Sequence, residues 1–168
     1  MKKLFLLLIP FLLFGCSNTL NTPTGAVENF LSSYQNLDSE LLEDLDQVID
    51  KDDEMTDKQK EKYHDLMVKQ YKNLSYKIKS EDVVEDTAEV EVEIEVLNYA
   101  SSIQESKKYY KDHASEVDDF VDYKIQNMEN VTNKTHYTIT FYLNKVENEW
   151  VVEELDDVNI QKIHGLYE

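Results

Sequence analysis

Four glutamates in the middle of the chain are the first residues whose spacing suggests chemistry. The stretch AEVEVEIEV alternates glutamate with aliphatic residues and contains Glu89, Glu91, Glu93 and Glu95. Calcium needs about six to eight oxygen ligands in one place, whereas alternate residues of a strand lie roughly 6.6 Å apart. A straight ladder cannot converge on one ion, although two neighbours joined by a loop acid could hold one. We therefore expect a solvated strand face.

Other candidate ligands are scattered. The acidic run Asp50–Glu54 favours a solvated loop, with a cation-binding module as the alternative. No HxH or HExxH pair suggests zinc. The chain has four histidines in separate segments, and we expect each to face solvent or to be hydrogen-bonded: His64, His113, His136 and His164.

The single cysteine, Cys16, lies where an apolar run ends. Basic residues Lys2 and Lys3 precede the run Leu4–Gly15, a pattern typical of a signal peptide. The run is too short to cross a bilayer, which needs about 20 residues. One cysteine cannot form an intramolecular disulfide, so the thiol serves another chemistry or none.

The four residues Leu13-Phe14-Gly15-Cys16 resemble a bacterial lipobox, with Phe14 where that family usually has a small residue. The resemblance implies that residues 1–15 are removed and that Cys16 is lipid-modified on sulfur. Residues 16–23 would then form a lipidated cysteine and flexible tether, and residues 24–168 a single domain. Acyl chains stabilise membrane binding by about 0.8 kcal/mol per buried CH₂. We expect a lipid-anchored protein on the extracytoplasmic face of the cell membrane; the alternative is a secreted protein with a free thiol.

The charge balance limits the partners. Removing Lys2 and Lys3 from the 17 basic residues leaves 15 against 35 acidic ones, a net charge of about −20. Such a domain is repelled by phosphates, so we expect no nucleic-acid partner. The chain contains no arginine and no GxxxxGK[ST] or GxGxxG motif, and we expect no cofactor.

Helical spacing dominates the first half of the domain. Thr24 can cap a helix whose apolar stripe should lie against a sheet, and Asp38 or Ser39 can cap a second helix. Thr56 with Gln59 forms a capping-box pattern that opens a third. The stripe of the first helix consists of Val27, Phe30, Leu31, Tyr34 and Leu37.

The second half alternates between strand and helix. A strand from Leu74 should pair with the glutamate-rich strand through a loop of residues 85–87, which sets Lys79 opposite Glu93 and Lys77 opposite Glu95. Residues 99–128 return to helical spacing, with an interruption near 112–115. The stretch HYTITFYL and residues 150–155 then form a hairpin around Glu147-Asn148.

The predicted fold class is α+β: three helices packed on a curved four-stranded antiparallel sheet with a helical insertion. The stretches AVENFLSSYQNLD and NKVENEWVVEEL, together with this order, resemble the nuclear transport factor 2-like (cystatin-like) superfamily over residues 24–158. The resemblance implies a cone with a pocket at its open end. In that superfamily the pocket serves catalysis, binding or neither.

Five residues are candidates to line that pocket. If Trp150 and Val152 face the core, period two turns Glu154 inward, where burial would raise its pKa; the alternative is that the strand end twists and Glu154 meets water. The other candidates are Tyr34, Tyr137 and Phe141. We expect a noncatalytic domain that binds a small ligand, a peptide or an envelope protein. The alternatives are a SnoaL or isomerase-like enzyme and an acidic cation-binding module.

Overall fold

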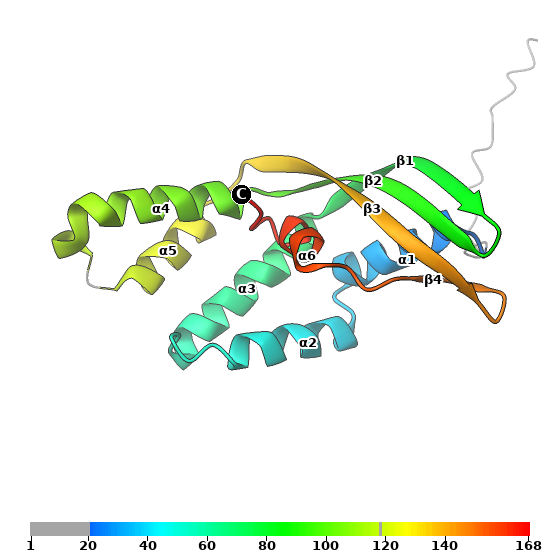
Figure 1. Cartoon of the computed structure of the whole chain (residues 1–168). Coiled ribbons are helices and arrows are strands. Elements are labelled where there is room, and N and C mark those ends of the chain that lie inside the picture. Colours follow the sequence, from blue (N-terminus) through cyan, green and yellow to red (C-terminus); the bar gives the residue numbers. More distant parts are fainter. Residues whose placement is uncertain (1–20, 118) are drawn as a thin grey trace, which may run out of the picture.

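The structure, a computed structural model, describes residues 21–117 and 119–168 (Figure 1). The described residues form six α-helices, one short 3-10 helix and one four-stranded antiparallel sheet, so the α+β prediction is confirmed. The predicted leader and Cys16 lie outside the described residues.

Three helices precede the sheet, as predicted: α1 (Pro23–Asn36), α2 (Ser39–Asp50) and α3 (Asp57–Asn73). Helix α3 begins with the expected capping box of Thr56 and Gln59. Helix α1 lies against strands of the sheet, α3 packs on α1, and α2 packs on α3.

The predicted cap of α1 was wrong by two residues. Thr22, not Thr24, is the N-cap, and its hydroxyl accepts a hydrogen bond from the Gly25 N–H. Pro23 follows at the first helical position, where its fixed φ suits the helix and its missing N–H leaves no donor unsatisfied.

The sheet is a meander in the order β1-β2-β3-β4. Its strands are β1 (Ser75–Val84), β2 (Thr87–Leu97), β3 (Lys134–Val146) and β4 (Glu149–Val152). The predicted alternation is confirmed, because the aliphatic residues of β2 are buried towards the helices and its glutamates lie on the other face. The two central strands, β2 and β3, contribute the buried residues Ala88, Val90, Val92, Ile94, Val96, Leu97, Ile139, Phe141 and Leu143.

The predicted register of the first hairpin was wrong by two residues. Lys77 pairs with Glu93 rather than Glu95, and the loop is the two residues Glu85 and Asp86. The difference has two causes of one residue each: the loop is one residue shorter than predicted, and a β-bulge between Ile78 and Ser80 adds one residue to β1. Lys79 nevertheless forms the expected ion pair with Glu93, with 3.5 Å between Nζ and Oε2.

The bulge turns Glu81 to the helix side of the sheet. Its register partner is Val90, whose side chain is buried. The Glu81 carboxylate accepts hydrogen bonds from the Thr24 N–H and hydroxyl, at 2.9 and 2.6 Å. An anion at a helix N-terminus is stabilised by the unpaired N–H groups and the helix dipole.

We expect Glu81→Gln to lower the free energy of unfolding by about 1 kcal/mol, because the charge at the α1 N-terminus is lost. Urea denaturation measures the change. The control is Asp82→Asn, which removes the same charge from the neighbouring exposed residue on the other sheet face. Equal destabilisation by both substitutions would contradict this role of Glu81.

The helical insertion forms a two-helix arm at one end of the molecule (Figure 1). It consists of α4 (Tyr99–His113), the 3-10 helix η1 (Ala114–Glu116) and α5 (Phe120–Glu129). The interruption thus falls close to its predicted position. Two features differ from the prediction: β4 ends at Val152, and a helix not predicted from the sequence, α6 (Asp157–Ile163), follows it.

The opposite end of the molecule carries the β3–β4 turn and the first described residue. Glu147 and Asn148 have φ of 51° and 69°, the positive values of a two-residue hairpin turn. The Asn21 side-chain amide donates to the Asn148 carbonyl, and the Trp150 N–H donates to Asn21 Oδ1 at 3.3 Å. The chain entering α1 is therefore tied to this turn.

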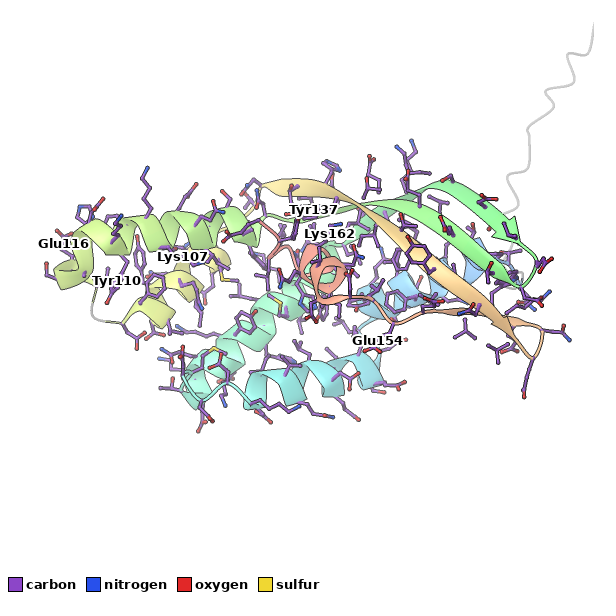
Figure 2. The ribbon with its side chains drawn as sticks, viewed as in Figure 1. Lys107, Tyr110, Glu116, Tyr137, Glu154 and Lys162 are labelled. Atoms are coloured by element: carbon purple, nitrogen blue, oxygen red, sulfur yellow. The ribbon has the colours of Figure 1, made fainter. Side chains whose placement is uncertain are left out.

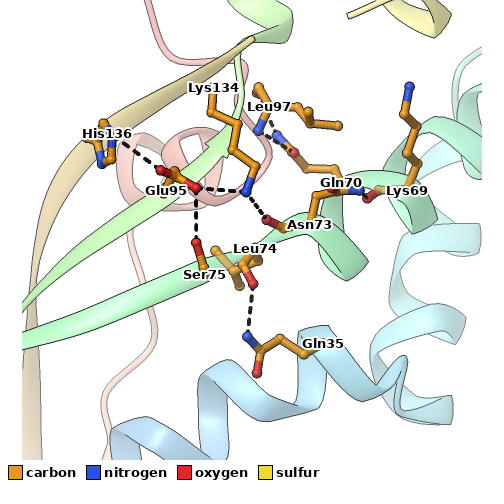
Figure 3. A network of polar contacts seen from close by, with 10 residues as sticks. All are labelled: Gln35, Lys69, Gln70, Asn73, Leu74, Ser75, Glu95, Leu97, Lys134 and His136. Atoms are coloured by element: carbon orange, nitrogen blue, oxygen red, sulfur yellow. Dashed lines mark hydrogen bonds and ion pairs between the residues drawn. The ribbon is translucent and has the colours of Figure 1, made fainter. Parts of the chain in front are cut away.

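A buried glutamine joins α3 to the end of β2. The Gln70 amide donates to the Leu97 carbonyl at 2.9 Å and accepts from the Leu97 N–H at 2.8 Å (Figure 3). Gly165, beyond α6, has a φ of 68° and packs against the same two groups. Its carbonyl accepts from the Ala100 N–H at 2.8 Å, so three segments meet here.

Candidate functional site

The space between α1 and the sheet, where a pocket was expected, is filled by side chains. Tyr34 and Phe141 are buried there. The ring of Phe30 lies between them, with centroids 5.6 Å from Tyr34 and 5.7 Å from Phe141. These two predicted residues are therefore close together but belong to the core.

A polar pair continues this aromatic cluster. The Tyr34 ring packs edge-on against Tyr71 at 5.0 Å, and the Tyr71 hydroxyl is hydrogen-bonded to His164 Nε2 at 3.0 Å. Burial raises the pKa of Tyr34 to about 12 and lowers the pKa of His164 to about 4. Tyr34 and His164 are therefore both neutral at pH 7. Tyr71, the hydrogen-bond partner of His164, is 2% exposed and offers no access to a substrate.

The other three residues predicted to line the pocket do not share a cavity with Tyr34 and Phe141. Tyr137 donates from its hydroxyl to the Tyr167 carbonyl at 2.7 Å. Trp150 packs against the core and has the Lys145 ammonium 5.6 Å from its ring centroid. Glu154 is exposed beyond the end of β4, so of the two possibilities given for this residue the structure shows the one in which it meets water (Figure 2). Strand β4 ends at Val152, so the alternation of side chains along a strand does not extend to Glu154.

The glutamate ladder lies on the solvated face of the sheet, as expected. Lys134 donates to Glu95 at 2.7 Å, and His136 Nε2 lies 3.4 Å from the same carboxylate (Figure 3). The hydrogen bond from Lys134 is the main cause that lowers the pKa of Glu95. Among residues 21–117 and 119–168, no three His, Cys, Asp or Glu side chains are placed to hold a metal ion.

The arm carries the hollows that make the strongest candidate binding site. One, of about 410 Å³, is bordered by α4, α5 and the segment after α5; the other, of about 320 Å³, lies towards η1. Tyr109 and Tyr123 line both hollows, which we together name the arm groove. The other residues lining the groove are Ser101, Ser102, Glu105, Glu116, Val117, Asp119, Asp122, Gln126, Asn127, Asn130, Val131 and Asn133.

Stacked rings form the wall shared by the two hollows. Tyr109 stacks on Tyr123 with centroids 5.4 Å apart, and on His113 at 4.2 Å with an interplanar angle of 11°. The Tyr109 hydroxyl donates to Glu116 at 3.0 Å, a hydrogen bond that raises the tyrosine pKa. The phenol therefore stays protonated, and its ring is held in one orientation.

Polar contacts hold the two helices of the arm in place. The Asp119 carboxylate caps α5 by accepting from the Val121 and Asp122 N–H groups at 2.8 and 3.0 Å. Together with a 3.3 Å hydrogen bond from Gln59 of α3, these bonds lower the pKa of Asp119. A buried hydroxyl, that of Ser106, accepts from the α5 amide of Asn127 at 2.9 Å. The groove thus has a fixed framework.

None of the residues lining the arm groove was a candidate from the sequence. Their spacing predicts a helix, and a tyrosine on a helix is more often explained by packing than by binding. The composition gave one hint, because the chain has 11 tyrosines, more than the six phenylalanines. The location of a tyrosine-lined site depends on how α4 and α5 pack together, which composition does not reveal.

Comparisons with known proteins place the chain in no family. No family model and no curated protein match it. A solved structure that resembles part of the chain is that of a candidate lipoprotein, ycdA, from Bacillus subtilis. The two are 17% identical, the TM-score is 0.44, and the match covers 67% of this chain and 38% of that one. The chain therefore matches well under half of that protein's length.

No helix in the described part of the chain combines the length and the apolar character needed to cross a bilayer.

Proposed function

We propose that the protein is a lipid-anchored extracytoplasmic binding protein, attached through Cys16, whose domain is noncatalytic. Its domain would take a small ligand, a peptide or an envelope protein in the arm groove. The observation that carries this proposal is the contrast between a filled interior and an open arm. Phe141 and Tyr71 occupy the space where a cone pocket would be, whereas stacked tyrosines line hollows on the arm.

The order of elements supports a distant relationship to the nuclear transport factor 2-like superfamily, which we propose as the origin of the fold. Three helices precede the sheet, and α1 lies against it. The isomerase-like alternative has less support, because Glu154, its proposed acid, is exposed.

The anchor is tested by Cys16→Ser expressed in a bacterium that lipidates its exported proteins. We expect the wild-type protein in the membrane fraction, with a diacylated Cys16 as its first residue in mass spectrometry. Cys16→Ser should leave that fraction, because the acylated sulfur is lost, while Ser17→Ala should behave like the wild type. An intact leader, or an unmodified Cys16 in the cytosol, would contradict the proposal.

A further inference from the structure

We infer that the arm groove binds a basic peptide segment, with lysine or arginine side chains entering the two hollows. This inference rests on the proposed function, because it takes the arm groove to be the binding surface. Alkylammonium and guanidinium groups are the chemistry that the groove recognises.

The charges of the groove favour a cation. Four carboxylates line it, those of Glu105, Glu116, Asp119 and Asp122, and none of the lining residues is basic. Asp119 is engaged as the α5 cap, and Glu116 accepts the Tyr109 hydroxyl through one of its two oxygens. The carboxylates that can face a ligand are therefore Glu105 in the first hollow and Asp122, with the other oxygen of Glu116, in the second. Lysines do occur on the arm, but they do not line the groove, and Lys107 lies 3.6 Å from Glu168 in an ion pair. An acidic or phosphorylated partner would be repelled here.

The aromatic wall favours the same ligand. The faces of tyrosine rings attract ammonium and guanidinium groups, by about 0.5–1 kcal/mol at exposed sites. Tyr109 and Tyr123 border both hollows. Because Tyr109 already stacks on His113 and on Tyr123, Tyr123 is the ring that we expect a cation to meet beside a carboxylate. An acidic cluster without this wall would attract cations without positioning them.

The shape of the groove indicates a peptide rather than a single small cation. The two hollows share Tyr109 and Tyr123 and therefore lie next to each other along the arm. One small amine would occupy only one of them, whereas an extended chain can place a basic side chain in each. Amides and hydroxyls border the first hollow, at Ser101, Asn127 and Asn130, and can exchange hydrogen bonds with a peptide backbone.

The test is fluorescence anisotropy with the full-length lipidated protein in nonionic detergent at physiological ionic strength. The probe is a labelled hexapeptide that alternates lysine and alanine, with a glutamate–alanine peptide and free spermidine as comparisons. Glu105→Gln combined with Glu116→Gln removes one charge from each hollow and should lower the affinity for the lysine peptide about tenfold. The matched control, Glu43→Gln with Glu91→Gln, removes two exposed charges elsewhere and should change affinity less than about twofold.

Tyr123→Leu provides an independent readout of the ring wall and should also weaken the lysine peptide, while circular dichroism verifies that each variant is folded. The inference is overturned if the two double variants lower the affinity for the lysine peptide equally, since the peptide would then be attracted by the net charge of the domain and not by the groove. It is also overturned if spermidine binds and the peptide does not, or if the glutamate peptide binds as well as the lysine peptide. The anchor is tested by a different experiment, fractionation and mass spectrometry of Cys16, so a failure of peptide binding leaves the proposed lipid anchor to be judged separately.

Discussion

Replacing Gly165 by alanine should lower the free energy of unfolding by about 4 kcal/mol, which would be among the largest effects of any single substitution in this chain. A Cβ atom there would lie 2.0 Å from the Leu97 carbonyl oxygen and 2.1 Å from Gln70 Nε2. Backbone must therefore move, and the hydrogen bonds between Gln70 and Leu97 are lost in a buried setting. The φ of 68° adds strain for any residue with a side chain.

Urea denaturation followed by circular dichroism measures this change. The matched control is Gly25→Ala in α1, where φ is not positive and alanine is the better helix former. We expect the control to change stability by less than about 1 kcal/mol. Similar destabilisation by both substitutions would show that Gly165 has no special position.

The second large effect is a loss of stability in acid that depends on His164. Burial holds the pKa of this histidine at about 4, below its usual 6.5. Between these two values the unfolded chain takes up a proton that the folded protein refuses, so the free energy of unfolding falls as the pH is lowered. Across the whole window the loss from this one group is about 3 kcal/mol.

The measurement is chemical denaturation from pH 7 to pH 4 for the wild type and for His164→Gln. The variant starts less stable but should lose less stability over this range, because it has no imidazole to charge. Tyr71→Phe separates the two causes that could depress the pKa: it removes the hydroxyl partner but keeps the ring that covers His164. We expect Tyr71→Phe to retain the wild-type slope; a flattened slope would mean that the hydrogen bond, not burial, sets the pKa.

Local patterns explain why so much of the fold could be predicted. The capping box at Thr56 and the two-residue turn at Glu147 are signals within a few residues, and the alternation in β2 follows directly from its burial on one face. The register of the first hairpin was not accessible in this way. A bulge near Lys79 leaves no mark in the apolar pattern, although it brings Glu81 of β1 to the N-terminus of α1.

The candidate site was harder to predict, because it depends on contacts between distant segments. Glu154 was placed inward by extending period two past the point where β4 ends. The groove instead needs Tyr109 of α4 beside Tyr123 of α5, and this pairing is set by a hydrogen bond between Ser106 and Asn127 and by the cap at Asp119. Spacing along one helix contains no information about such a pairing.

The hydrogen bonds between Asn21 and the β3–β4 turn determine which end of the domain lies closest to Cys16. Cys16 precedes Asn21 by five residues. Even a fully extended chain of that length spans at most about 18 Å. An acylated Cys16 would keep the hairpin tips, where Glu85, Asp86, Glu147 and Glu149 lie, at the end of the molecule nearest the membrane. The arm projects from the opposite end of the molecule (Figure 1), so attachment through Cys16 would leave the tyrosine stack at the end remote from the anchor and open to a ligand.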